Sequence, residues 1–239
     1  MNMLAVDTAT DILSLALQTE AGIWYLEQDA GLHHSENLLP LIDQLLEQSK
    51  MQQQDIQLLA CMKGPGSFTG LRIGYATVKG MALALGIPFI GIPTLDCIAE
   101  TWQTWPGIII PLIDAKKQCY FWAAYQRDQS AEPATCQRCT EYQDSPLSEV
   151  HTFLTTIPKN IPVLITGPDA ARAKPELESY LQSRRTAVSL YFDPWGRRGK
   201  ARELLANAEK QFTITKKGDD LSSGPLYLRK SDAEISKGL

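Results

Sequence analysis

A glycine-rich loop is the first feature of this 239-residue chain that could do chemistry. The run Lys63-Gly64-Pro65-Gly66-Ser67-Phe68-Thr69-Gly70-Leu71 leads from an apolar strand into a predicted helix. Backbone N–H groups at such a helix N-terminus can hold an anion. However, G-x-G-x-x-x-G is one residue off the dinucleotide fingerprint, and Leu71 stands where a P-loop has lysine. The favoured interpretation is that the glycines allow a sharp turn and close helix packing.

The pair Cys136 and Cys139 has the spacing of half a zinc site. A structural zinc site needs four ligands, and no second Cys or His pair follows at usable spacing. We therefore expect the polar stretch from Gln126 to Ser145 to be a surface loop. The five cysteines are too few, and odd in number, for a disulfide scaffold, which fits a cytoplasmic protein.

Composition excludes several classes of protein. The hydrophobic fraction is 44% and the charged fraction 21%, and the apolar runs stop short of the roughly 20 residues that span a bilayer. Asp7 ends the first apolar run before a signal peptide could form, so we expect neither membrane nor export. Residues 1–104 carry 4 Lys and Arg against 11 Asp and Glu, and residues 105–239 carry 19 against 16. This balance does not suit a protein that coats DNA.

The elements that position these residues form two similar halves. Apolar residues 3–6, Asp7, a polar turn and a second apolar run at 12–17 predict a hairpin, and the same order recurs at 108–113, Asp114 and 119–125. After each hairpin, helical and strand patterns alternate, which predicts an α/β fold. We expect lobes at 1–104 and 105–239 facing each other across a cleft, with the last segment packing back on the first lobe.

Helical and strand segments are expected at these ranges. In the first lobe they are helix 35–48, strand 58–62, helix 69–85, strand 88–92 and helix 95–104. In the second lobe they are helix 147–157, strand 163–166, helix 175–184 and helix 199–212.

Two helices of the first lobe are more apolar than a surface helix needs. In the helix at 69–85, Ala76, Gly80 and Ala84 recur every four residues and so form a stripe on which another helix backbone could sit. The helix at 35–48 carries leucines and an isoleucine on more than one face. Both features predict a helical subunit interface, and the alternative is that both helices are sandwiched inside the monomer.

Four motifs resemble the TsaB family, also called YeaZ. They are Asp7-Thr8-Ala9-Thr10, His34-Ser35-Glu36-Asn37-Leu38-Leu39-Pro40, Gly64 to Gly74, and Pro225-Leu226-Tyr227-Leu228-Arg229. The resemblance implies a two-lobed fold of the actin-like, sugar-kinase and Hsp70 (ASKHA) type with duplicated lobes. It also implies a non-catalytic role in forming threonylcarbamoyladenosine at position 37 of tRNAs that read ANN codons.

Partners follow from the same resemblance. The chain is expected to bind TsaD, the transferase subunit, through first-lobe helices, with the ATPase TsaE joining the pair, and to form a homodimer through the same helices when TsaD is absent. The expected partner-binding residues are His34, Leu38, Leu39, Ile42, Leu45, Arg72, Ile73, Ala76, Lys79, Gly80 and Ala84.

Catalytic machinery of the partner type is not expected here. TsaD holds a metal with H-x-x-x-H, whereas the corresponding stretch here, residues 93–100, carries no histidine. The resemblance makes Asp7 and Asp114 candidates for a vestigial nucleotide and Mg²⁺ cleft, although hydrogen bonds to their own turns are the favoured use. We expect no cofactor beyond weak nucleotide binding.

Other functions are open at this point. An ATP-dependent phosphotransferase of the same superfold is the alternative, whereas a metallopeptidase would need an H-E-x-x-H that the chain lacks. A basic cluster at Arg184-Arg185 and at Arg197-Arg198-Gly199-Lys200-Ala201-Arg202 could touch tRNA phosphates, with a solvated helix entry as the ordinary explanation. We expect tRNA contact mainly through the complex.

Overall fold

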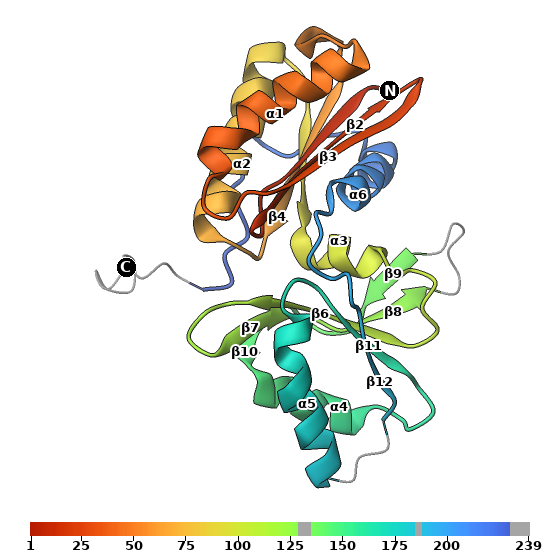
Figure 1. The fold of residues 1–239 in the computed structure, drawn as a ribbon. Helices are drawn as coiled ribbons and strands as arrows, with labels where there is room; N and C mark the ends of the chain where they lie inside the picture. The colour runs from red at the N-terminus through yellow and green to blue at the C-terminus, as the bar shows by residue number, and fades with distance from the viewer. Residues whose placement is uncertain (129–134, 185–187, 230–239) are drawn as a thin grey trace. The chain divides into compact units, whose positions relative to one another are not determined.

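A computed structural model describes residues 1–128, 135–184 and 188–229. The chain forms two compact units (Figure 1). Among the described residues, unit 1 comprises 1–101 and 197–225, and unit 2 comprises 102–196 and 226–229. The chain first passes from unit 1 to unit 2 after residue 101, three residues before the expected boundary at 104. Residues 197–225 then return to unit 1, in keeping with the expectation that the last segment packs back on the first lobe, and the chain enters unit 2 again at 226.

Unit 1 is built on a five-stranded sheet with the order β3-β2-β1-β4-β5. β1, β2 and β3 are antiparallel, and β4 and β5 run parallel to β1. The strands are β1 (Met3–Asp7), β2 (Ile12–Thr19), β3 (Gly22–Asp29), β4 (Leu58–Gly64) and β5 (Phe89–Pro93). The helices are α1 (His34–Ser49), α2 (Phe68–Leu85), α3 (Thr94–Glu100), α6 (Ala201–Thr215) and a short 3₁₀ turn at Gln53–Asp55.

Both faces of this sheet are apolar, and each face is covered by helices. α1 and α2 pack on the face that carries Leu4 and Val6. α6 packs on the face that carries Met3 and Ala5, through the buried side chains Ala201, Leu204, Leu205 and Ala208. All five residues of β1 are buried as a result. The central strands therefore read as continuous apolar runs rather than as alternating ones.

The assignment of α6 to the second lobe was wrong. Helix 199–212 was predicted among the elements of the second lobe, yet α6 belongs to unit 1. The physical reason is that the second apolar face of the first sheet needs more cover than α3 supplies, and α6 provides it. Periodicity shows that a helix has an apolar face but does not tell which sheet it covers.

Unit 2 repeats the plan with the strand order β10-β7-β6-β11-β12 and a short branch in which β8 pairs with β6 and β9. Its hairpin β6–β7 corresponds to β1–β2, and β11 lies parallel to β6 as β4 lies parallel to β1. The predicted duplicated α/β fold is confirmed. The strands are β6 (Ile108–Asp114), β7 (Cys119–Trp122), β8 (Tyr125–Asp128), β9 (Thr135–Arg138), β10 (Gln143–Pro146), β11 (Val163–Thr166) and β12 (Leu190–Phe192). The helices are α4 (Leu147–Thr156) and α5 (Ala170–Arg184).

Three predicted segments differ from the structure. The stretch from Gln126 to Ser145 contains most of β8, all of β9 and most of β10 rather than only a loop, because short strands with polar side chains carry little apolar signal. α3 ends at Glu100, before the predicted 104. α5 begins at Ala170, so Pro175 lies inside it and does not mark its start.

The cysteine pair lies on and just after β9, and neither cysteine forms a disulfide bond within the part of the chain that the structure describes. Within the described ranges, no group of three or more His, Cys, Asp and Glu side chains could hold a metal ion. In the same part of the chain, no helix is long and apolar enough to cross a membrane.

Candidate docking surface on the first unit

The glycine loop packs directly against the turn between β1 and β2. A Cβ on Gly66 would lie 2.3 Å from the Ala9 carbonyl oxygen, and one on Gly70 would lie 2.1 Å from that of Thr8. Two hydrogen bonds join the same segments: Ser67 N donates to Ala9 O at 2.8 Å, and Thr8 Oγ1 donates to Gly70 O at 2.8 Å. The close-packing interpretation of the glycines is confirmed.

Two backbone N–H groups at the start of α2, those of Ser67 and Gly70, are already used. Ser67 Oγ caps the helix by accepting from Gly70 N at 3.2 Å. Ser67 N is occupied by Ala9 O. These donors bond within the protein, so the geometry supports a structural loop rather than a phosphate cradle.

Asp7 is buried, with 2% of its surface exposed, and fixes the start of α6. Its carboxylate accepts from Lys200 N at 2.8 Å and from Ala9 N at 3.1 Å, and Ser14 Oγ lies 3.4 Å away. Burial raises the pKa of Asp7, while these hydrogen bonds oppose the rise. A carboxylate enclosed in this way has its acceptor capacity committed to the fold, so it is poorly placed to hold Mg²⁺.

Asp114 occupies the equivalent position in unit 2 but is paired with cations. Its Oδ2 lies 2.8 Å from Arg172 Nη1 and 3.0 Å from Lys116 Nζ, and its Oδ1 accepts from Lys116 N at 2.8 Å. Burial would raise the pKa of Asp114, but the hydrogen bonds from Arg172 and Lys116 outweigh it and lower that pKa to about 2. Because two cations already neutralise the carboxylate, a divalent metal gains little there.

Four of the predicted partner-binding residues lie in the core of unit 1. Leu38, Ile42 and Leu45 are each 1% exposed, and His34 is 4% exposed with its Nε2 2.8 Å from Thr10 O. Their side chains face the sheet because α1 must cover it. The prediction that these four side chains contribute directly to a binding surface is therefore corrected: they hold α1 in place.

Five of the remaining seven predicted residues are exposed on α1 and α2. Leu39 is 55% exposed, and a Cβ on Gly80 would meet no atom within 4 Å. Ile73 and Lys79 are half-buried. Leu83, 70% exposed, was missed although its spacing of three from Gly80 places it beside the small-residue stripe. We define the docking face by its exposed residues: Leu39, Arg72, Ala76, Gly80, Leu83 and Ala84.

Charge divides the surroundings of this face. α1 carries the exposed acids Glu36, Asp43 and Glu47 and no Lys or Arg. α2 carries Arg72 and Lys79 and no acid. Because α1 and α2 belong to one unit and pack in the same core, a surface with an acidic half and a basic half is self-complementary under two-fold symmetry.

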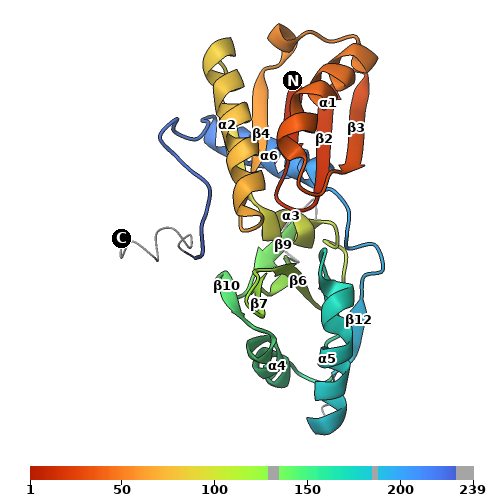
Figure 2. The same ribbon diagram turned by 60° about the vertical axis from the view of Figure 1, so that its left-hand side comes forward.

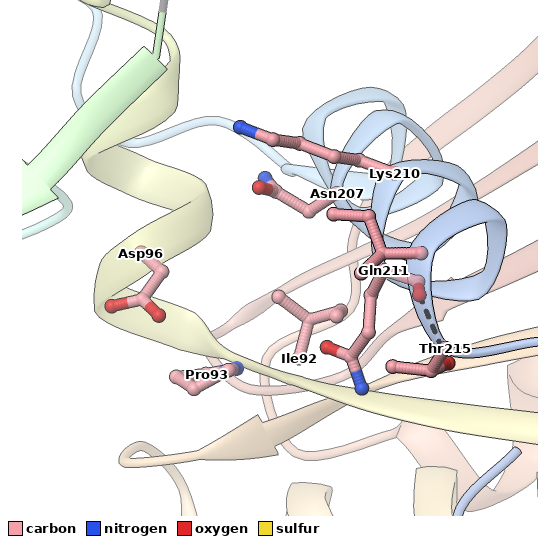
Figure 3. A pocket seen from close by; sticks show the side chains of 8 residues that line it. Ile92, Pro93, Asp96, Asn207, Lys210, Gln211 and Thr215 are labelled. Atoms are coloured by element: carbon pink, nitrogen blue, oxygen red, sulfur yellow. Dashed lines mark hydrogen bonds between the residues drawn. The ribbon is translucent and has the colours of Figure 1, made fainter. Parts of the chain in front are cut away.

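A pocket of about 280 Å³ opens elsewhere on unit 1, between β5, α3 and α6 (Figure 3). Figure 3 shows Asp96 on α3 and Lys210 on α6 on different walls, with Ile92 below them. The pocket is lined by Ile92, Pro93, Asp96, Asn207, Lys210, Gln211, Ile214 and Thr215. This lining offers charged and amide groups to a small polar molecule but no histidine, cysteine or serine nucleophile.

The basic cluster is largely engaged within unit 1. Arg197 makes two hydrogen bonds to Asp29, at 2.8 and 2.9 Å, and the Arg202 guanidinium lies 4.7 Å from the centre of the Tyr25 ring. Lys200 is 6% exposed. Arg185 lies outside the described residues. The described part of the cluster therefore resembles the ordinary helix entry more than an open phosphate-binding patch.

Comparisons with known proteins agree with the fold. Residues 26–145 match the family model for TsaD, tRNA N6-adenosine threonylcarbamoyltransferase. The chain is 36% identical to the Escherichia coli "tRNA threonylcarbamoyladenosine biosynthesis protein TsaB" over 54% of this chain and 57% of that protein. It is 30% identical to the Bacillus subtilis protein of the same name, over 76% and 77% of the two lengths. The match thus spans little more than half of the Escherichia coli relative.

Solved structures show the same architecture. YeaZ from Pseudomonas aeruginosa is 22% identical with a TM-score of 0.75, covering 95% of this chain and 99% of that one. A second Pseudomonas aeruginosa structure, described as similar to peptidase YeaZ, has a TM-score of 0.78 at 23% identity over 95% and 99% of the two chains. At these identities the likeness concerns the fold alone.

Proposed function

This chain belongs to the TsaB family, and on that premise we propose that it is a non-catalytic subunit required for threonylcarbamoyladenosine formation at adenosine 37 of tRNAs that read ANN codons. It would act by binding and supporting TsaD, with TsaE joining the pair. The observation that carries the proposal is the docking face. It combines exposed apolar side chains with a stretch of α2 whose backbone is open to solvent, since a Cβ on Gly80 would meet no atom within 4 Å. The proposal implies a cytoplasmic location.

The shape of the face suits a helix. Ala76, Gly80 and Ala84 let a second helix approach the α2 backbone closely, as in small-residue helix contacts. Leu39 and Leu83 expose 55% and 70% of their surface and supply the apolar area that an interface core needs. Exposed apolar side chains gathered on one face of a protein are typical of an interaction site.

The non-catalytic part of the proposal rests on the contacts that the aspartates of the two duplicated hairpins make in this structure. Asp7 is enclosed by backbone donors, and Asp114 is paired with Arg172 and Lys116. Neither arrangement fits a nucleotide-bound Mg²⁺, so the phosphotransferase alternative loses its best candidate ligands. We propose that the subunit uses no cofactor, and that any tRNA contact is made mainly through the complex.

The same face supports a homodimer when the partner is absent. Its acidic α1 and basic α2 would meet the opposite charges of a second copy in a two-fold arrangement. A partner protein that contains a similar lobe would bind the same surface, so the heterodimer would compete with the homodimer. We expect both associations to weaken with salt, because exposed charges are screened.

The test is a matched pair of bulky substitutions. Gly80→Phe should abolish co-elution with purified TsaD and disperse the homodimer, because the ring fills the floor of the face, while open space around Gly80 leaves unit 1 folded. Ala206→Phe, an exposed small residue on α6, is the control and should bind normally. Equal binding of both variants, or normal threonylcarbamoyladenosine levels in total tRNA of a deletion strain, would refute the proposal.

A further inference from the structure

Residues 216–225, here called the strap, follow α6 and lie on the outer edge of β5, an end strand of the first sheet. Asp219 N donates to Phe89 O at 2.7 Å, and Gly91 N donates to Asp219 Oδ2 at 3.1 Å. A Cβ on Gly218 would lie 2.8 Å from Phe89 O. The strap therefore covers an edge that would otherwise present unpaired backbone groups.

The strap is also attached to α2. Lys79 Nζ donates to Ser223 O at 2.8 Å, and Lys63 Nζ lies 3.9 Å from Asp219 Oδ2. A Cβ on Gly91 would lie 2.4 Å from Tyr75 Oη and 3.3 Å from Asp219 Oδ2, so α2, β5 and the strap meet at this point. Figure 2 shows the strap passing beside α2. Most residues of the strap are exposed, so apolar burial contributes little to its attachment and polar contacts hold it in place.

The attachment point borders the docking face. On a helix with 3.6 residues per turn, Lys79 lies next to Ala76 and Leu83 and on the opposite flank from Ile73. Ile73 packs against the core shared with α1, so α1 flanks α2 on that side. The strap flanks α2 on the Lys79 side and exposes 48% of Leu221. α2 therefore lies between α1 on one side and the strap on the other.

We propose that the strap forms the second wall of the docking face and that Lys79 is a positioning residue that holds it there. The occupant is one helix of the partner protein, seated on Ala76 and Gly80 between α1 and the strap. α2 carries two cations and no acid, so a helix that presents acidic side chains on the strap side fits best. This inference rests on the proposed function and assigns Lys79 an indirect part in it.

The experiment combines affinity with hydrogen exchange in the full chain. Lys79→Met removes the donor to Ser223 O and keeps the aliphatic stem, and Asp219→Ala removes the contacts to Gly91 and Lys63. Both should speed amide exchange at Gly91 and Asp219 and weaken TsaD binding by roughly 3- to 10-fold, as the loss of one or two net hydrogen bonds would. Lys159→Met, at an exposed lysine of unit 2, is the matched control and should change neither quantity.

The double variant separates an indirect role from a direct contact. If Lys79 and Asp219 act through the strap, the double variant should bind about as well as either single variant. Additive losses, or faster exchange with unchanged affinity, would overturn the inference, as would a Lys79→Met loss without faster exchange. If the wild-type chain binds no TsaD, the proposed function itself fails. If the wild-type chain binds TsaD and the variants give one of the contrary results above, only the inference about the strap fails.

Discussion

The two units share a topology but use it differently. In unit 1 the helix after the central parallel strand, α2, carries a small-residue stripe and exposed Leu83. In unit 2 the corresponding helix, α5, is polar on its outer side and carries the pair Lys174 and Glu178 at a spacing of four. The outer side of α5 is thus polar, whereas that of α2 is mostly apolar apart from Arg72 and Lys79. On the proposed function, we expect association to be confined to unit 1.

The paired aspartates differ in the same way. Asp7 is solvent-excluded and bonds to backbone donors, whereas Asp114 is neutralised by the partly exposed side chains of Arg172 and Lys116. One hairpin carboxylate thus joins distant parts of unit 1, and the other ties the turn of unit 2 to α5. In both units the duplicated aspartate therefore ties its hairpin turn to another part of the same unit.

The largest expected effect concerns the glycines that join α2 to the first hairpin. Gly70→Ala should cost more than about 3 kcal/mol of unfolding free energy, because its Cβ would lie 2.1 Å from a backbone oxygen that cannot move freely. Gly80→Ala, on the outer side of the same helix, should stabilise the chain by up to about 1 kcal/mol. Urea denaturation of both variants checks this contrast, and equal effects would contradict the packing described for α2.

Removing each hairpin carboxylate should reveal the difference between the units. Asp7→Ala leaves the buried donors Lys200 N and Ala9 N unpaired and should cost about 2–5 kcal/mol. Asp114→Ala should cost about 1 kcal/mol, because its cationic partners are exposed to water. Thermal unfolding with probes in each unit measures both. A larger loss for Asp114→Ala would reverse the comparison.

Partner binding should distinguish the two corresponding helices. Ala76→Phe on α2 should weaken association by about 100-fold or more, the size of an interface hot spot. Ala171→Phe, at an exposed alanine of α5, should leave the affinity unchanged. Titration calorimetry with TsaD measures both variants. If Ala171→Phe also blocked binding, association would not be confined to unit 1.

The smallest effect is the pH dependence of stability. The lowered pKa of Asp114, about 2 in the folded state, gives stability that is present above pH 4 and lost as the pH falls toward 2. Solvent exposure of its partners limits this loss to under about 1 kcal/mol. The raised pKa of Asp7 acts with the opposite sign, since the folded state binds a proton more readily than the unfolded one.

Acid titrations of two variants separate these contributions. Asp114→Asn should flatten the loss of stability between pH 4 and pH 2. Asp7→Asn should remove a decrease in stability that wild type shows as the pH rises above the unfolded-state pKa of aspartate. Unchanged profiles for both variants would show that neither carboxylate titrates differently in the folded state.

Much of the fold could be predicted because its signals are local. The duplicated hairpins, the strand before the glycine loop and the helix after it follow from apolar periodicity and glycine placement within short windows. The spacing of the glycines alone predicted that the loop is structural and does not bind phosphate. The close contacts of Gly66 and Gly70 with the first hairpin agree with this prediction. The stripe of Ala76, Gly80 and Ala84 was also read from spacing, and all three residues are exposed.

The outward face of α1 could not be read in this way. Leucines and Ile42 cover more than one side of that helix, so no single face is marked for the core. The sheet beneath it decides, burying Leu38 and Ile42 and leaving Leu39 exposed. Sequence alone placed all three in one interface.

The amino-acid sequence by itself determined the α/β class, the two-fold repetition and the structural use of the glycine loop, because each depends on residues close together in the chain. The sequence also predicted that the last segment packs back on the first lobe. Only the tertiary structure decided which residues return to unit 1, where α6 covers the second face of the sheet and Lys79 binds the strap across 144 positions of the chain. Contacts at such separations depend on which apolar face and which sheet edge lack cover, and no local pattern records that.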